Sequence, residues 1–106
     1  MANPYAGEVA LVIAGERHVL KLTLGALAEL EAGLDSGSLV ELVERFEGGG
    51  FSTRDVLALI VAGLRGGGWP GEPRDLLAAE IEGGPLGAAR AAAELLARAF
   101  VPPEAG

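Results

Sequence analysis

The spacing of apolar residues changes once near the start of this chain, and that change constrains the fold more than any other feature. From Glu8 to Thr23, apolar residues alternate with other residues, which is typical of β-strands with one buried face. From Leu24 onward they recur every three or four positions, which is the spacing of a helix face. Thr23 stands at the boundary and suits a helix N-cap. The sequence therefore predicts an α+β fold in which an N-terminal β-hairpin packs on four to five short α-helices.

The alternating part divides into two runs on either side of residues 14–17. Gly15 lies in this break and can adopt the positive φ angle that tight hairpin turns need. Because an isolated hairpin is marginal in water, we expect helices to cover its apolar face. That face is formed by Val9, Leu11, Ile13, Leu20 and Leu22.

Capping residues and glycines divide the rest of the chain into helices. Ser38 with Glu41, and Ser52 with Asp55, have the spacing of capping boxes, and Pro73 suits a first helical position. The expected helices cover about 24–33, 38–47, 52–65, a short segment from Pro73, and 86–100. The third is the most apolar, so we expect it to be central. The expected buried stripes are Leu24, Leu27, Leu30 and Leu34 in the first helix, and Leu86, Ala89, Ala93, Leu96 and Phe100 in the last.

Length and composition limit the possible classes of protein. A chain of 106 residues suits a single domain, 1–106, with an ordered core at about 7–100 and flexible termini. The net charge of −7 disfavours nucleic acid as a partner, because phosphate binding needs an excess of Lys and Arg. No apolar run reaches the roughly 18 residues of a membrane span, so we expect no membrane association. The absence of cysteine is compatible with the bacterial cytoplasm.

Residue types that carry catalysis do not cluster in the sequence. His18 is the only histidine, and we interpret it as a partly exposed strand residue. Glu41 and Glu44 share a helix face, which is more typical of a solvated surface than of paired catalytic carboxylates. The glycines of 63–68 follow a helix rather than precede one, which is the wrong arrangement for a phosphate loop. We therefore expect no enzyme activity, no metal and no cofactor.

Three apolar residues are candidates for partner binding: Trp69, Leu96 and Phe100. Tryptophan is enriched in binding hot spots, and Trp69 lies in a glycine-flanked loop, although it can equally fold back onto the core. The Ala-rich face of the last helix and an exposed hairpin edge are further possible contact surfaces. The segments 38–47 and 52–65 could suggest a helix-turn-helix, but their acidic faces argue against DNA binding.

Four segments resemble one family, and together they span about residues 7–100. They are Gly7-Glu8-Val9, Leu22-Thr23-Leu24-Gly25-Ala26-Leu27-Ala28-Glu29-Leu30-Glu31, Glu44-Arg45-Phe46, and Ala62-Gly63-Leu64-Arg65-Gly66-Gly67-Gly68. The family is the small protein of the tail-gene cluster in alphaproteobacterial gene transfer agents and related siphophage-like prophages, of the tail tube or tail assembly chaperone type. The segment from Leu22 to Glu31 is the most specific part of the resemblance.

The resemblance implies a non-enzymatic role in tail morphogenesis. A tail assembly chaperone would bind the tape-measure protein and the tail-tube protein in the cytoplasm, and self-association is possible. The alternative is a permanent structural subunit of the tail, such as a tube or connector protein. We expect the chaperone, because a tube subunit generally needs a larger β-rich body that closes a ring. A small enzyme or a DNA-binding regulator is a third and weaker alternative.

Overall fold

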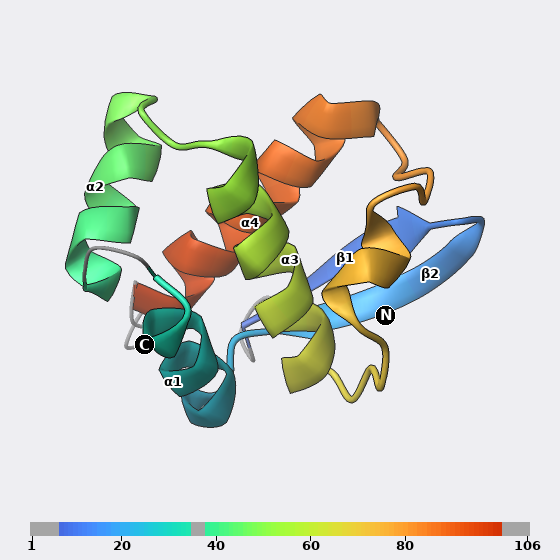
Figure 1. Cartoon of the computed structure of the whole chain (residues 1–106), viewed down its shortest axis with the longest axis horizontal. Helices are drawn as coiled ribbons and strands as arrows, with labels where there is room; N and C mark the ends of the chain where they lie inside the picture. The colour runs from blue at the N-terminus through green and yellow to red at the C-terminus, as the bar shows by residue number, and fades with distance from the viewer. Residues whose placement is uncertain (1–6, 35–37, 101–106) are drawn as a thin grey trace, which may run out of the picture.

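The computed structural model describes residues 7–34 and 38–100, and it shows a β-hairpin packed against helices (Figure 1). The α+β fold expected from the sequence is confirmed. Residues 1–6 and 101–106 lie outside the described residues. So does Asp35-Ser36-Gly37, a cluster of turn-forming residues that the sequence predicts to end the first helix. In chain order the elements are β1 (Glu8–Ile13), β2 (Glu16–Lys21), α1 (Leu24–Ala32), α2 (Leu39–Gly48), α3 (Thr53–Gly66), the 3-10 helix η2 (Pro73–Leu76) and α4 (Gly84–Phe100).

The hairpin pairs β1 with β2 antiparallel, from Glu8 opposite Lys21 to Ile13 opposite Glu16. The connecting turn has only two residues, Ala14 and Gly15, so the expected four-residue break is shorter than the sequence suggested. Their φ angles are 52° and 79°, and positive values at both central positions are what a type I′ turn requires. This turn matches the right-handed twist of the strands, and it places every second β1 side chain from Val9 to Ile13 in the core.

The turn offers a stabilising substitution, because Ala14 is the one non-glycine residue with positive φ among those described. We expect Ala14→Asn to raise the free energy of unfolding by about 0.5–1 kcal/mol, since Asn tolerates this conformation and Asn-Gly is the preferred type I′ pair. Urea unfolding measures the change. As a control, Ala10→Asn is also exposed but lies in extended β1, where Asn is disfavoured, so it should be neutral or destabilising.

Other parts of the chain cover much of both hairpin edges. At the β2 edge, Gly66 and Gly67 at the end of α3 lie directly against the carbonyl oxygens of Lys21 and Val19, where an added Cβ would overlap them. At the β1 edge, Glu82 N donates to Val12 O at 2.9 Å and Ala14 N donates to Glu80 O at 2.7 Å.

The far end of the β1 edge is covered as well, because the guanidinium of Arg98 donates a hydrogen bond to the backbone oxygen of Glu8. Little continuous backbone therefore remains for the addition of a partner strand.

Helix α3 is the centre of the fold, as its apolar sequence predicted. It packs against β2, α1 and α4 and supplies the largest group of buried residues (Figure 1). Ser52 and Asp55 form the predicted capping box, with Ser52 Oγ accepting from Asp55 N at 3.1 Å and Asp55 Oδ2 accepting from Ser52 N at 2.9 Å. Gly63 lets α4 approach closely, because an added Cβ would lie 2.8 Å from Leu95 Cδ1.

Caps and ends of the other helices also follow the sequence. Thr23 Oγ1 accepts from Ala26 N at 3.1 Å, and Ser38 Oγ accepts from Glu41 N at 3.2 Å. The predicted capping box of Ser38 with Glu41 is only half formed, because no hydrogen bond from Ser38 N to the Glu41 side chain occurs between these two described residues. Gly49, with a φ angle of 78°, ends α2 in the left-handed conformation.

The short helix predicted from Pro73 is a single 3-10 turn, and Leu77 just after it is 74% exposed. Ile81, which the apolar pattern could also place in that short helix, forms an isolated bridge with Ile13 beside the hairpin.

The expected buried stripe of α4 was wrong in orientation, whereas that of α1 was wrong only at Leu24, since Leu30 is buried and Leu27 and Leu34 pack against the core. In α1, Leu24 is 84% exposed and Ala26 is buried instead. In α4, Leu86 is 68% exposed and Phe100 45% exposed. The buried face of α4 is formed by Ala88, Ala91, Ala92, Leu95 and Leu96. In a helix rich in alanine, several stripes have similar apolar character, and the close approach of Leu95 to Gly63 decides which one faces the core.

Candidate functional site

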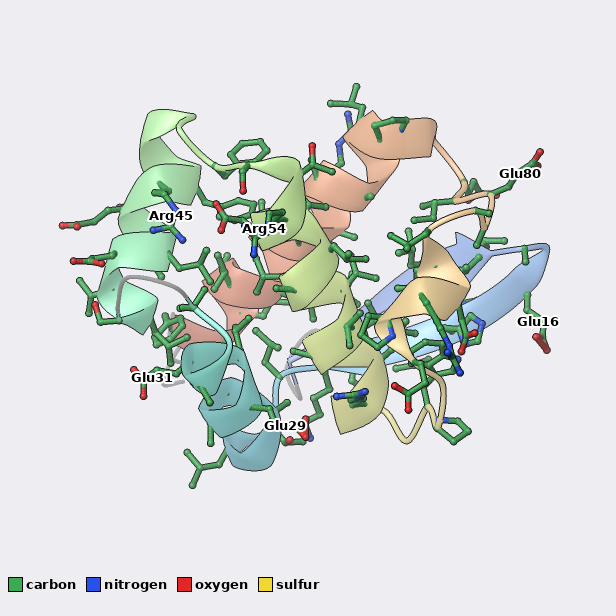
Figure 2. All side chains as sticks on the ribbon, viewed as in Figure 1. Glu16, Glu29, Glu31, Arg45, Arg54 and Glu80 are labelled. Carbon is green, nitrogen blue, oxygen red and sulfur yellow. The ribbon has the colours of Figure 1, made fainter. Side chains whose placement is uncertain are left out.

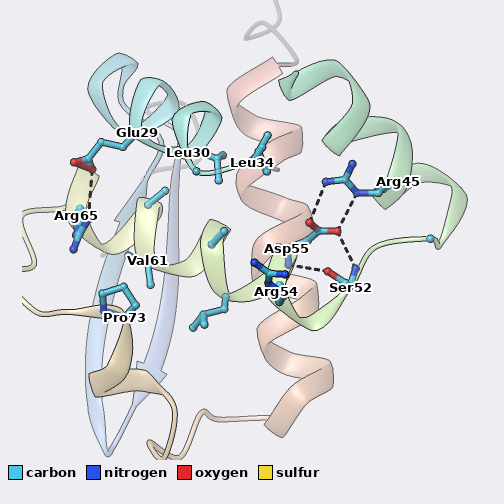
Figure 3. Close-up of a pocket in the computed structure, with 15 residues that line it drawn as sticks. Glu29, Leu30, Leu34, Arg45, Ser52, Arg54, Asp55, Val61, Arg65 and Pro73 are labelled. Atoms are coloured by element: carbon cyan, nitrogen blue, oxygen red, sulfur yellow. Dashed lines mark hydrogen bonds and ion pairs between the residues drawn. The ribbon is translucent and has the colours of Figure 1, made fainter. Parts of the chain in front are cut away.

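A groove of about 590 Å³ runs along α3, between α1 and α2 (Figure 3). Its floor comes from α3, including Leu57, Ala58 and Val61, of which the first two are half-buried. Leu30 and Leu34 from the end of α1 form one wall. The groove is thus an open, mainly apolar surface between helices.

Three arginines line the groove: Arg45 from α2, and Arg54 and Arg65 from the two ends of α3. Figure 2 shows Arg45 and Arg54 between α2 and α3, whereas Glu16 and Glu80 lie near the tip of the hairpin. The carboxylates that line the groove are Glu29 and Asp55, so its charged side chains sum to +1 in a chain whose net charge is −7. The groove is therefore far less acidic than the chain as a whole.

Arg45 and Asp55 form a two-point ion pair that ties α2 to the start of α3 (Figure 3). Arg45 Nε donates to Asp55 Oδ2 and Nη2 donates to Oδ1, both at 3.0 Å. The hydrogen bond from Arg45 holds the pKa of Asp55 below its ordinary value of 3.8, against the opposing effect of burial, and the backbone N–H of Ser52 adds to the lowering. Asp55 is only 9% exposed, so its carboxylate is largely shielded from solvent. Its hydrogen bonds to Arg45 hold the two helices together.

The ion pair at the other end of the groove is weaker. Arg65 Nη1 lies 3.8 Å from Glu29 Oε2, and their side chains are 36% and 58% exposed. Pairs of this kind contribute only about 0–1 kcal/mol, because water screens them. Arg54 also has an interaction within the chain.

A second, smaller hollow of about 310 Å³ lies between the hairpin tip, the loop after α3 and η2. His18 and Trp69 both line it. The ring of Trp69 folds over Gly71, where an added Cβ would overlap the ring atoms, and it packs against the core. Of the two positions expected for Trp69, the structure shows the one in which the residue folds back and covers part of the core.

The three residues proposed for partner binding lie on separate parts of the surface or inside the core. Trp69 is half-buried in the loop, Phe100 is 45% exposed at the end of α4, and Leu96 is 4% exposed within the core. Leu96 therefore presents almost no surface to a partner in this structure. None of the three lines the α3 groove. Partner binding by Trp69 and Phe100 stays a prediction.

The groove was not identified from the sequence, although one signal was present in it. Arg54 and Arg65 are eleven positions apart in a predicted helix, which places them on the same face about three turns apart. Sequence reasoning assigned Arg65 to the glycine-rich helix end and did not connect it with Arg54.

No cluster of metal-ligating side chains occurs in residues 7–34 and 38–100. In these ranges, no group of three or more His, Cys, Asp or Glu side chains could hold a metal ion. His18 lines the smaller hollow together with Glu16 and Asp75, but no hydrogen bond or ion pair joins them in the described part of the chain. The helices of the described residues are also too short or too polar to cross a membrane.

Comparison with known proteins gives one family. A family model described as "Phage tail tube protein, GTA-gp10" matches residues 6–101, which is nearly the whole chain. No curated protein and no solved structure matches significantly.

Proposed function

Because this chain belongs to the family of phage tail tube proteins described as GTA-gp10, we propose that it is a non-catalytic component of a gene-transfer-agent or phage-like tail, acting at the tail tube. The observation that carries this proposal is the extent of the match, residues 6–101. The family description favours a permanent role, as a subunit of the tube or of a connector. The chain then works through protein–protein contacts with other tail components.

A tail assembly chaperone is the second candidate, and the hairpin favours it. The sheet has only two strands, and segments of the same chain cover much of both edges. A ring built by joining sheets between subunits needs accessible strand edges, which this hairpin offers only in part. A small domain with an apolar groove suits transient binding to the tape-measure and tail-tube proteins in the cytoplasm before the tail is complete.

The protein composition of purified particles distinguishes the two roles. We expect quantitative mass spectrometry of intact tails to find this chain in a fixed ratio to the other tube proteins. Its presence in the producing cells but not in particles, together with co-purification with the tape-measure protein, would instead establish the chaperone. Normal tails from a strain lacking the gene would contradict both roles.

A further inference from the structure

Helix α3 presents a regular pattern of side chains to the groove. Arg54, Ala58, Val61 and Arg65 follow one another at intervals of four, three and four residues, so they lie along one face of the helix. The pattern has a small apolar centre and one guanidinium group at each end. Eleven residues of α-helix span about 16 Å, so the two arginines stand about three turns apart.

We propose that this groove docks one amphipathic helix of a partner protein, which places an apolar stripe on the half-buried Leu57 and Ala58 and acidic residues near Arg54 and Arg65. A helix fits because the groove lies between helices, where the side-chain ridges of a third helix can pack. Acidic residues fit because guanidinium groups bind carboxylates with two parallel hydrogen bonds. The charge complementarity is local: the charged side chains that line the groove sum to +1, and Arg54 and Arg65 stand at its two ends, in a chain whose net charge is −7.

The present contacts of the two end arginines permit such an exchange. Arg65 is paired with Glu29 at 3.8 Å on an exposed surface, so an incoming carboxylate can replace or share this contact. Arg54 is exposed and also has an interaction within the chain, so an incoming carboxylate must share or replace that interaction. Arg45 differs from both, because its two hydrogen bonds to the buried Asp55 keep it in the structure of the groove wall.

The partner helix is defined by this spacing. Its two acidic residues lie eleven positions apart, on the same face as the apolar residues between them, because both helices have the same rise per residue. This proposal does not depend on whether the chain is a tube subunit or a chaperone. Failure of the groove experiment therefore leaves the particle-composition result unaffected.

A synthetic helical peptide tests the proposal directly. The probe is an 18-residue, fluorescently labelled, Ala- and Leu-rich peptide with glutamates at its fourth and fifteenth positions. Its control has the same composition, with the second glutamate moved by two positions and so turned to the opposite face of the helix. We expect the matched peptide to bind the full chain with a micromolar Kd in fluorescence anisotropy, and the shifted peptide to bind about tenfold more weakly.

Charge-reversal variants locate the binding to the groove. Arg54→Glu and Arg65→Glu should each weaken binding of the matched peptide about tenfold, and binding should also weaken as salt is raised. Arg90→Glu is the matched control, because Arg90 is exposed on α4 and does not line the groove, and it should change binding less than twofold. Circular dichroism and thermal unfolding check that each variant is folded.

Three results would overturn the proposal. The first is equal binding of the matched and shifted peptides, or no binding of either at millimolar concentration. The second is unchanged binding to a folded Arg54→Glu, Arg65→Glu double variant. The third is self-association of the chain in sedimentation that the same double variant abolishes, which would identify a second copy of the chain as the occupant of the groove.

Discussion

Gly66→Ala is expected to lower the free energy of unfolding by about 3 kcal/mol, at the upper end of the usual cost of inserting an atom into a packed site. The added Cβ would overlap the backbone carbonyl oxygen of Lys21, at the edge of β2. A flexible side chain could move away, but this neighbour is the backbone of a paired strand. Relief of the overlap must separate α3 from β2, which pack against each other in the centre of the fold.

Gly48→Ala is the matched control for this substitution. Gly48 also lies in the last turn of a helix, α2, but an added Cβ there meets no atom within 4 Å. Alanine is the better helix former by about 1 kcal/mol, so the control should be neutral or slightly stabilising. Urea unfolding of both variants measures the difference. Equal stability of the two would mean that the close approach of α3 to β2 can relax at little cost.

The second large effect is expected for Asp55→Ala, which should lower the free energy of unfolding by about 3 kcal/mol. Removal of one partner from a buried ion pair costs about 3–5 kcal/mol, and the 32% exposure of the Arg45 side chain places this pair at the lower end of that range. The substitution also removes the acceptor for Ser52 N. Helix α2 should loosen first, because the ion pair holds it to the start of α3, and the stack of Phe46 on Phe51, with ring centroids 4.5 Å apart, holds it only to the segment before α3.

Asp75→Ala supplies the comparison, because Asp75 makes the same capping contact at an exposed site. It accepts from Glu72 N at 2.8 Å in η2 and has no arginine partner among the described ion pairs. The loss of an exposed cap should cost only about 0.5–1 kcal/mol. Chemical unfolding of both variants at pH 7 tests the contrast. If the two substitutions lower the free energy of unfolding equally, the Arg45–Asp55 ion pair adds no stability beyond that of the cap.

The pKa of Asp55 gives this contribution a characteristic dependence on pH. Since its pKa in the folded chain is below the ordinary value of 3.8, the contribution is complete above that value. It is lost as the pH falls below about 4 toward the folded-state pKa, because the unfolded chain then binds the proton more readily. The free energy of unfolding should therefore fall more steeply with acid in the wild type than in Asp55→Ala. Parallel pH profiles would contradict the assigned role of the carboxylate.

Local signals in the sequence predicted the secondary structure well, because each depends on residues close together in the chain. Thr23, Ser38 and Ser52 are N-caps as expected, since a short polar side chain needs only the next turn of backbone to satisfy its hydrogen bond. Alternation identified the buried hairpin face because side chains of a strand alternate between its two sides. The family match supports the resemblance of this chain to a tail protein of gene transfer agents.

The functional surface was much less accessible to sequence reasoning. Leu96 was a candidate partner contact and lies in the core, whereas Arg54 and Ala58 were not candidates and line the groove. A single sequence shows that an alanine-rich helix has several faces that could be buried. It does not show which face the neighbouring elements will cover. Tryptophan is a residue type that is common in binding sites, yet the ring of Trp69 folds over Gly71.

The sequence by itself determined the order of the strands and helices and most of their ends, because caps, glycines and apolar periodicity act over one or two turns of chain. It also indicated that α3 is central, since this helix carries more Val, Leu and Ile residues than any other described helix. Only the tertiary structure decided which face of α4 is buried, how closely α3 approaches β2, and that Arg45, from another helix, joins Arg54 and Arg65 around one groove. These features depend on distances between residues far apart in the chain, and such distances are set by the packing of whole elements against one another.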